Sequence, residues 1–492
     1  MPFRPKTGRD LLEEIKDWPL EAKDDDTARY FFHVDGLPLL LAGKRNYVIG
    51  RKGTGKTSIA EYLRNYAQTN YFAQKLTFKN FPFNTLYELQ DNSYTSPNQY
   101  ITMWKYVMYS ALCRMLIANE AFDHKKREFL KSFFPDNIEV VLQSYVKRFR
   151  DRSITFSAFG VGGGVGEGGK GQASDTDWAY RISILEEWIF ENIDSAHYLI
   201  VFDELDEDYK DVHSKTNKAP LYFDLLTSLY KASQDIRSLS QRAKANIIPV
   251  IFLRNDIYDL LRDPDKNKWR DRTIDLSWKR EGLTKLLAYR ISRAIQPDGD
   301  ILDFGAAWDQ VFSVTSTRYG NRKRRDTRPS QDTLSYILRG TYMRPRDLVS
   351  FVKECARIAL EDSERTRISN DVIKLADEDF SNYMRREIVD EIHSVLPDIE
   401  EILDVFADIR KPIMPISDFK VGYSKYLNIK GAREGDDLTF ERILEILFHF
   451  GVIGNITSGN YQVFRSGDGR SKFNFSERIC LHRGLLKCLH IY

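Results

Sequence analysis

A glycine-rich segment near the N-terminus constrains this chain most. It reads GRKGTGKT from Gly50 to Thr57, follows the β-prone run 46–49, and precedes apolar residues at positions 59, 62, 63 and 66, which have helical spacing. Glycines permit a tight turn and let backbone N–H groups approach an anion, and the N-terminus of the next helix adds its positive dipole end. A strand, this turn and a helix in sequence predict a phosphate-binding loop.

The residues of this loop have distinct expected roles. We expect Lys56 to reach the β- and γ-phosphates of a nucleotide and the Thr57 hydroxyl to bind Mg²⁺. The predicted cofactors are therefore ATP and Mg²⁺. The nucleotide-binding set comprises the whole loop and the residue that follows it: Gly50, Arg51, Lys52, Gly53, Thr54, Gly55, Lys56, Thr57 and Ser58.

An acidic pair follows a second strand-like segment. Residues 197–204 read HYLIVFDE, a continuous apolar run that ends in two carboxylates, as expected of a parallel strand buried on both faces. We predict that Asp203 binds Mg²⁺ and that Glu204 is the general base for the attacking water. The alternative is a core strand that runs into an acidic surface turn.

A third buried strand is predicted at 246–253, and polar residues follow it as well. Arg254 or Asn255 at its tip is our candidate for a catalytic residue that senses the γ-phosphate. The alternative is that both residues only cap the helix that starts near Asp256.

The order of these motifs resembles the AAA+/STAND branch of P-loop ATPases. Residues 341–348, TYMRPRDL, resemble the second sensor of that branch, and the resemblance implies that Arg346, with Arg344 as second choice, contacts the γ-phosphate from a helical lid. A simple surface arginine is the alternative. The resemblance also makes Arg270 and Arg272 candidates for an arginine finger that acts on a neighbouring subunit.

A narrower resemblance covers most of the chain, from about residue 30 to the end. The segments 51–57, 252–257 and 344–348 resemble those of little-characterised bacterial P-loop ATPases, several of which look like components of anti-phage defence systems. The resemblance implies an ATPase module that works with an effector protein.

The expected fold class is α/β, with a parallel P-loop sheet, a helical lid and a C-terminal winged-helix domain. We expect a strand at 75–79 and a helix at 100–116 between the two nucleotide motifs, and in the C-terminal region helices at 400–407 and 440–450 with strands at 461–464 and 473–475. The predicted domains are an N-terminal segment 1–29, an ATPase core 30–296 with an inserted glycine-rich loop 159–171, a lid 297–390 and a winged-helix-like interaction domain 391–492.

Composition limits the partners. The 73 basic and 71 acidic residues leave a net charge of +2, so the overall charge does not indicate nucleic-acid binding. Only the basic cluster at 318–328 could bind a phosphate backbone. The alternative is that this cluster is a solvated loop. No apolar run reaches the ~18 residues that a membrane span needs, which predicts a cytoplasmic protein without a membrane partner. Two of the four cysteines, Cys480 and Cys488, lie near His482 and His490, but these residues lack the usual zinc-ligand spacing.

These features together predict an ATPase that serves as a conformational or assembly switch. We expect it to form a homo-oligomer and to control a partner effector, in bacterial anti-phage defence. Two other functions remain open at this point: a DNA-bound AAA+ initiator or loader that resembles origin-recognition ATPases, and a nucleotide-gated scaffold with little turnover.

Overall fold

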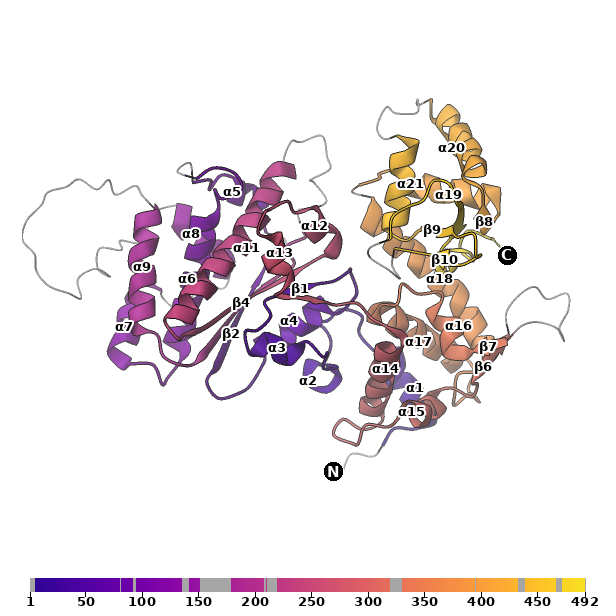
Figure 1. The fold of residues 1–492 in the computed structure, drawn as a ribbon. Coiled ribbons are helices and arrows are strands. Elements are labelled where there is room, and N and C mark those ends of the chain that lie inside the picture. Colours follow the sequence, from indigo (N-terminus) through magenta and orange to yellow (C-terminus); the bar gives the residue numbers. More distant parts are fainter. Residues whose placement is uncertain are drawn as a thin grey trace, which may run out of the picture. The chain divides into compact units, whose positions relative to one another are not determined.

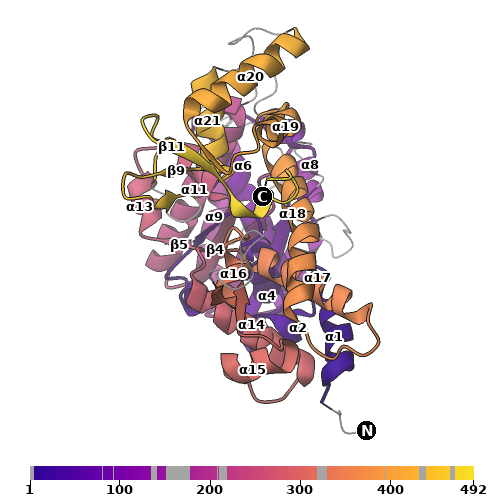
Figure 2. The same cartoon turned by 90° about the vertical axis from the view of Figure 1, so that its right-hand side faces the viewer.

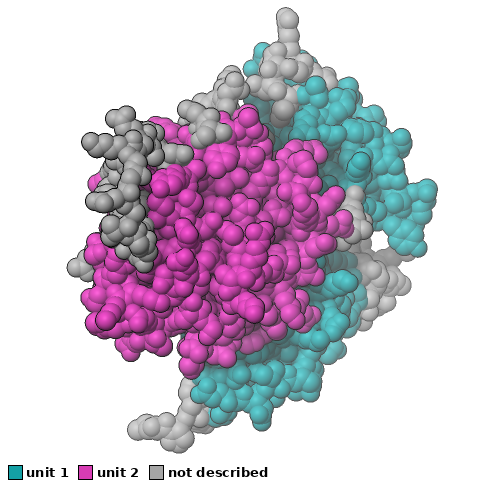
Figure 3. Space-filling view, turned by 60° about the vertical axis from the view of Figure 1, so that its left-hand side comes forward, with its two compact units in different colours: residues 1–32, 277–492 teal, residues 33–276 magenta. Residues whose placement is uncertain are grey.

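The computed structural model is shown from two sides in Figure 1 and Figure 2. It forms two compact units, coloured in Figure 3: unit 2 holds residues 33–276, and unit 1 holds 1–32 together with 277–492. The residues that the structure describes are 5–79, 81–91, 94–134, 141–150, 178–207, 209, 219–318, 330–393, 395–431, 439–465 and 471–491.

A parallel sheet forms the centre of unit 2. Its strand order is β2-β3-β4-β1-β5, and every neighbouring pair is parallel. The central strands are buried along nearly their whole length, which explains their continuous apolar sequences. Because the strands are parallel, their carboxyl ends meet at one edge. The strands are β1 (Tyr47–Ile49), β2 (Tyr71–Thr77), β3 (His197–Asp203), β4 (Asn246–Leu253) and β5 (Thr273–Asp275).

Helices cover this sheet. The helix α6 is apolar on all sides and almost wholly buried, because it packs against the sheet and also against the helices around it. The helices of unit 2 are α3 (Leu37–Leu41), α4 (Lys56–Arg64), α5 (Phe83–Tyr87), α6 (Ile101–Ala118), α7 (His124–Phe133), α8 (Val141–Arg150), α9 (Trp178–Asn192), α11 (Ala219–Arg242), α12 (Asn255–Leu260) and α13 (Lys266–Arg270).

Unit 1 is mainly helical and has its own hydrophobic core. The helix α1 packs on α17, and α17 and α18 lie side by side, as Figure 2 shows. Its first part contains α1 (Gly8–Lys16), α2 (Thr27–Tyr30), α14 (Arg280–Ile295), α15 (Phe304–Val311), β6 (Ser316–Arg318), β7 (Ser330–Asp332), α16 (Thr333–Leu338), α17 (Pro345–Leu360) and α18 (Asn370–Ile392).

The C-terminal part of unit 1 combines helices with an antiparallel sheet of order β10-β9-β11-β8. This arrangement agrees with the winged-helix prediction. Its elements are α19 (Ile399–Ile409), β8 (Ile413–Met414), α20 (Ile416–Lys430), α21 (Phe440–His449), β9 (Ile453–Ile456), β10 (Gln462–Val463), β11 (Arg478–Leu481) and the short 3₁₀ helix η3 (Arg483–Leu485).

One predicted strand is wrong. Residues 473–475 form no strand, and the last strand begins later, at Arg478. The side chain of Asn455 binds the backbone N–H and carbonyl of Asn474 at 2.9 Å each. Side-chain contacts therefore satisfy this backbone, and Phe473 packs its ring against Phe448 instead of joining the sheet.

The predicted fold class is confirmed: a parallel α/β sheet with a phosphate-loop turn, a mainly helical region and a C-terminal helix-and-sheet domain. The compact units divide at residues 32/33 and 276/277, so α14 groups with unit 1, where it packs on α1, α15 and α17. The glycine-rich loop 159–171 lies outside the described residues. Among the residues described, no helix is both long and apolar enough to span a membrane.

Candidate nucleotide site

The glycine-rich loop links β1 to α4. Gly53 and Gly55 have φ angles of 82° and 97°, in the left-handed region that side chains disfavour. A Cβ placed on Gly55 would meet no heavy atom within 4 Å, whereas a Cβ on Gly50 would lie 2.6 Å from the Thr54 hydroxyl oxygen. Glycine is therefore required at 50 for close contact and at 53 and 55 for backbone shape, and the loop is open beside Gly55.

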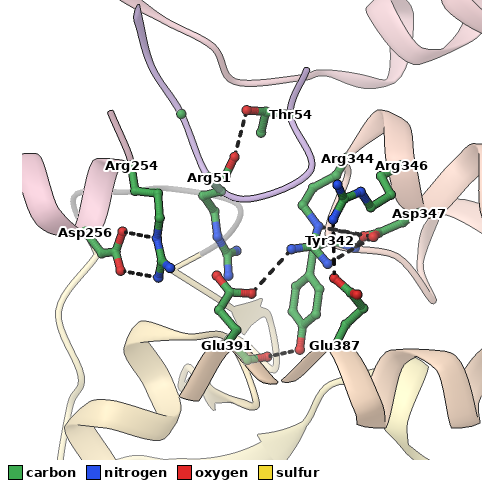
Figure 4. Close-up of polar contacts among 12 residues, drawn as sticks. Arg51, Thr54, Arg254, Asp256, Tyr342, Arg344, Arg346, Asp347, Glu387 and Glu391 are labelled. Atoms are coloured by element: carbon green, nitrogen blue, oxygen red, sulfur yellow. Dashed lines mark hydrogen bonds and ion pairs between the residues drawn. The ribbon is translucent and has the colours of Figure 1, made fainter. Parts of the chain in front are cut away.

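Lys56 lies at the centre of this loop. Its Nζ donates to the carbonyl oxygens of Gly50 and Arg51 at 2.9 and 3.0 Å, and the Thr54 hydroxyl donates to the same Arg51 oxygen at 2.8 Å, as Figure 4 shows for Thr54 and Arg51. Burial lowers the pKa of the Lys56 ammonium below its ordinary value. The loop thus holds one cation against its own backbone, the position expected of a phosphate-binding lysine.

The remaining predicted loop residues surround this lysine. Thr57 and Ser58 lie in the first turn of α4, where the helix N-terminus points its N–H groups outward. Arg51 and Lys52 are partly exposed in the loop itself. All the residues predicted to bind the nucleotide therefore lie in the turn after β1 and the first turn of α4.

The acidic pair lies at the end of β3. Asp203 is 2% exposed, and its Oδ2 lies 2.8 Å from Nζ of Lys75 on the neighbouring strand β2. Burial raises the pKa of the Asp203 carboxyl above its ordinary value, and the Lys75 ammonium opposes that rise. Glu204 has a φ of 62°, which turns the chain sharply at the strand end, and Thr77 donates a hydrogen bond to its carboxylate.

The donor set here fits Mg²⁺. The Asp203 carboxylate and the Thr57 hydroxyl are oxygen ligands, which this cation prefers, and both belong to elements that pack together, β3 and α4. Glu204 immediately follows Asp203 and is partly exposed, so it is available to a water molecule.

Arg254 is the residue between β4 and α12. Its guanidinium binds both carboxylate oxygens of Asp256, at 3.1 and 2.6 Å, and lies 3.8 Å from Asp206 Oδ2, as Figure 4 shows for Asp256. Asn255 opens α12. The charges of Arg254 and Asp256 both act on Lys56. Arg254 is the N-cap residue of α12 but makes no side-chain capping hydrogen bond, and its role as a γ-phosphate sensor stays a prediction.

The two arginines predicted as second-sensor candidates differ sharply in environment. Arg344 is 1% exposed and binds Asp347 and Glu391 in the core of unit 1. Arg346 is 19% exposed and pairs with Glu21 at 3.2 Å and Glu387 at 3.7 Å. Arg346 belongs to unit 1 and the phosphate loop to unit 2, so a contact of Arg346 with the γ-phosphate stays a prediction.

Other predicted residues have simpler surroundings. Arg270 is exposed at the end of α13, and Arg272 donates to the carbonyl of Lys44 at 3.1 Å. Their role as arginine fingers stays a prediction. Of the basic cluster 318–328, all but Arg318 lies outside the described residues, so DNA binding there is also still a prediction.

The cysteines and histidines at the C-terminus pack in unit 1. His482 accepts a hydrogen bond from Gly484 N at 3.2 Å and stacks on Tyr342 with ring centroids 4.2 Å apart, while Cys480 is buried. Within the described ranges, no group of three or more His, Cys, Asp or Glu side chains is placed to hold a metal ion.

Sequence reasoning missed several residues that contact the predicted site. Lys75 and Thr77 lie on β2, whose pairing with β3 places Thr77 directly opposite Asp203. Glu61 on α4 binds Lys75 at 2.8 Å. A usable signal was present: Lys75 is a charged residue inside a predicted strand, and Glu61 follows Thr57 by four residues, on the same face of a helix.

Comparison with known proteins gives partial matches. The family model of the FunZ-associated C-terminal helical domain matches residues 281–389, which run from α14 into α18. The putative transposon gamma-delta 80.3 kDa protein of Escherichia coli strain K12 is 25% identical over 298 residues. That alignment covers 58% of this chain and 39% of the relative, so this chain matches well under half of the relative's length.

Three solved structures are loosely similar, each 12% identical. They are Cdc6p from Pyrobaculum aerophilum (TM-score 0.31, covering 95% of this chain and 96% of the other), the Aeropyrum pernix ORC1 protein in complex with DNA (0.36, 98% and 96%) and Drosophila ORC bound to DNA (0.29, 100% and 93%).

Proposed function

We propose that this protein binds ATP with Mg²⁺ at the loop 50–57 and hydrolyses it, and that the bound nucleotide controls its assembly. The observation that carries the proposal is the position of the groups in one sheet. The loop leaves the carboxyl end of β1, and Asp203 and Glu204 stand at the carboxyl end of β3, on the same edge. Ligands of open α/β sheets bind outside this edge.

Each residue has a defined task in this proposal. Lys56 and the N–H groups of the loop bind the phosphates, and Thr57 and Asp203 hold the metal ion, which supplies charge neutralisation at the phosphate oxygens. Glu204 accepts a proton from the attacking water, while the hydrogen bond from Thr77 fixes the direction of its carboxylate. Arg254 or Asn255 senses the γ-phosphate from the tip of β4.

In this proposal, unit 1 responds to the bound nucleotide through an arginine that senses the γ-phosphate. Of the two arginines that the AAA+/STAND resemblance offers as second sensor, Arg346 suits the role better. Its guanidinium is 19% exposed and pairs with Glu21, which is 66% exposed, and with the largely buried Glu387, whereas Arg344 is enclosed. The ion pair with Glu21 is exposed and therefore weak, so Arg346 can leave this partner at little free-energy cost.

The assembled form is a homo-oligomer that acts on an effector protein, and the setting is bacterial anti-phage defence. This part of the proposal rests on the resemblance of segments 51–57, 252–257 and 344–348 to ATPases of such systems. The proposal names no particular effector protein. Its first measurable consequence is therefore assembly that depends on bound nucleotide.

Glu204→Gln tests the proposal, with Glu207→Gln as a matched control on the exposed turn that follows. Removal of a general base lowers turnover by about 10²–10⁴-fold. We expect Glu204→Gln to bind ATP, to lose phosphate release by at least about 100-fold, and to show a larger mass by light scattering with ATP than without nucleotide. Phosphate release equal to that of Glu207→Gln would refute the assignment of Glu204.

A further inference from the structure

Lys75 is a buried cation that joins two elements of the nucleotide site. Its side chain is 5% exposed, and its Nζ lies 2.8 Å from Oδ2 of Asp203 on β3 and 2.8 Å from Oε1 of Glu61 on α4. Burial alone would lower the pKa of the Lys75 ammonium, but Asp203 and Glu61 raise it above its ordinary value. Both carboxylates are themselves shielded from solvent, at 2% and 10% exposed.

The two partners of Lys75 belong to the elements that carry the predicted Mg²⁺ ligands. Asp203 is one of those ligands. Glu61 follows the other, Thr57, by four residues in α4, so the two side chains share a helix face. A lysine on β2 therefore ties the strand that carries Asp203 to the helix that carries Thr57.

We propose that Lys75 is a positioning residue for the metal site: it holds the Asp203 carboxylate and, through Glu61, the helix α4 in the relative placement that Mg²⁺ binding requires. This inference rests on the proposed function, because it assumes that Asp203 and Thr57 bind Mg²⁺. A carboxylate offers several acceptor sites on two oxygens, so the contact of Oδ2 with Lys75 leaves Asp203 able to bind a cation as well.

A purely structural ion pair predicts something different. Loss of a buried partner destabilises any protein in which the other charge stays buried. A positioning role adds a selective effect, because groups that orient metal ligands typically contribute about 10–100-fold to metal affinity. The two roles separate when folding stability and Mg²⁺ dependence are measured on the same variants.

Lys231 offers a matched control within unit 2. It lies on α11 and forms a comparable pair with Asp263, at 2.9 Å, in which the carboxylate is 1% exposed. Lys75→Met and Lys231→Met should both lower the thermal denaturation temperature. Only Lys75→Met should alter how nucleotide binding responds to Mg²⁺.

The experiment is a Mg²⁺ titration of the binding of a fluorescent ATP analogue, followed by fluorescence without reference to turnover. We expect Lys75→Met to raise the half-saturating Mg²⁺ concentration about tenfold, Glu61→Gln to raise it less, and Lys75→Arg, which keeps the charge, to stay near wild type. If Lys75→Met does not fold, Glu61→Gln decides the question: a raised half-saturating Mg²⁺ concentration supports the inference, and an unchanged one overturns it.

Two results would overturn the inference. An unchanged half-saturating concentration, equal to that of Lys231→Met, would reduce Lys75 to a structural ion pair. A lowered one would mean that Lys75 competes with the metal ion. Asp203→Asn separates this failure from that of the proposed function: if it leaves the Mg²⁺ dependence intact, Asp203 is no metal ligand, whatever Lys75 does.

Discussion

Arg254 in unit 2 and Arg344 in unit 1 occupy the same local position. Each is the N-cap residue of a helix, α12 or α17, and each binds an aspartate inside the first turn, Asp256 or Asp347. In sequence the two look alike, and both were candidates for a contact with the γ-phosphate.

Their surroundings differ. Arg344 has a second buried carboxylate, Glu391, and the ring of Tyr342 lies 5.0 Å from its guanidinium carbon, so it is closed in. Arg254 has as its second carboxylate Asp206, which is 33% exposed, and its charge acts on Lys56 in the phosphate loop. The same local arrangement therefore lies in the core of one unit and near the glycine-rich loop in the other, where Arg254 is also largely buried, with its side chain 11% exposed.

The largest expected effect is the loss of stability in Arg344→Met. The change leaves Asp347 and Glu391 buried without their cation, and breaking a buried pair in this way costs about 3–5 kcal/mol. We expect the free energy of unfolding of unit 1, measured by denaturant titration, to fall by that amount.

Arg346→Met on the same helix is the control for this experiment. Of the two partners of Arg346, Glu21 is 66% exposed and Glu387 is 17% exposed, so the loss of Arg346 should cost less than the loss of Arg344, whose partners are both enclosed. If Arg344→Met and Arg346→Met lower the free energy of unfolding equally, Arg344 has no special role in the stability of unit 1.

For Arg254→Met we expect some loss of stability, because its partner Asp256 is only 9% exposed, and in addition an effect on catalysis. Loss of one positive group that faces developing charge typically lowers kcat by about 10²–10³-fold. We expect kcat for ATP hydrolysis to fall about 100-fold while the ATP dissociation constant changes less than about threefold, a change of under about 1 kcal/mol.

Arg242→Met, an exposed arginine at the end of α11, is the control. If Arg254→Met unfolds the protein as Arg344→Met does, or hydrolyses ATP as fast as Arg242→Met, then Arg254 is a second scaffold arginine and the comparison fails.

The sequence predicted those parts of the candidate site that depend only on residues close together in the chain. The loop 50–57 and the strands that end at Asp203 and Leu253 follow from glycine spacing and apolar runs. Lys75 and Thr77 were missed because their role depends on which strand lies beside β3, and sheet order is a long-range property. The preference for Arg346 over Arg344 came from a resemblance, and only burial separates the two residues physically.

The strand expected at 473–475 shows a different limit. The alternation of Phe473, Asn474 and Phe475 is typical of a half-buried strand, but the amide of Asn455 satisfies the backbone of Asn474. A single long-range side-chain contact replaced the ladder that the pattern predicted.

The central claim is that the loop 50–57 is the ATP site, and calorimetric titration of ATP with Mg²⁺ into Lys56→Ala tests it most directly. Lys44→Ala, an exposed lysine of the same unit, is the control. The account predicts that Lys56→Ala loses detectable ATP binding while Lys44→Ala binds as wild type does. Equal ATP affinity in Lys56→Ala and Lys44→Ala would contradict it.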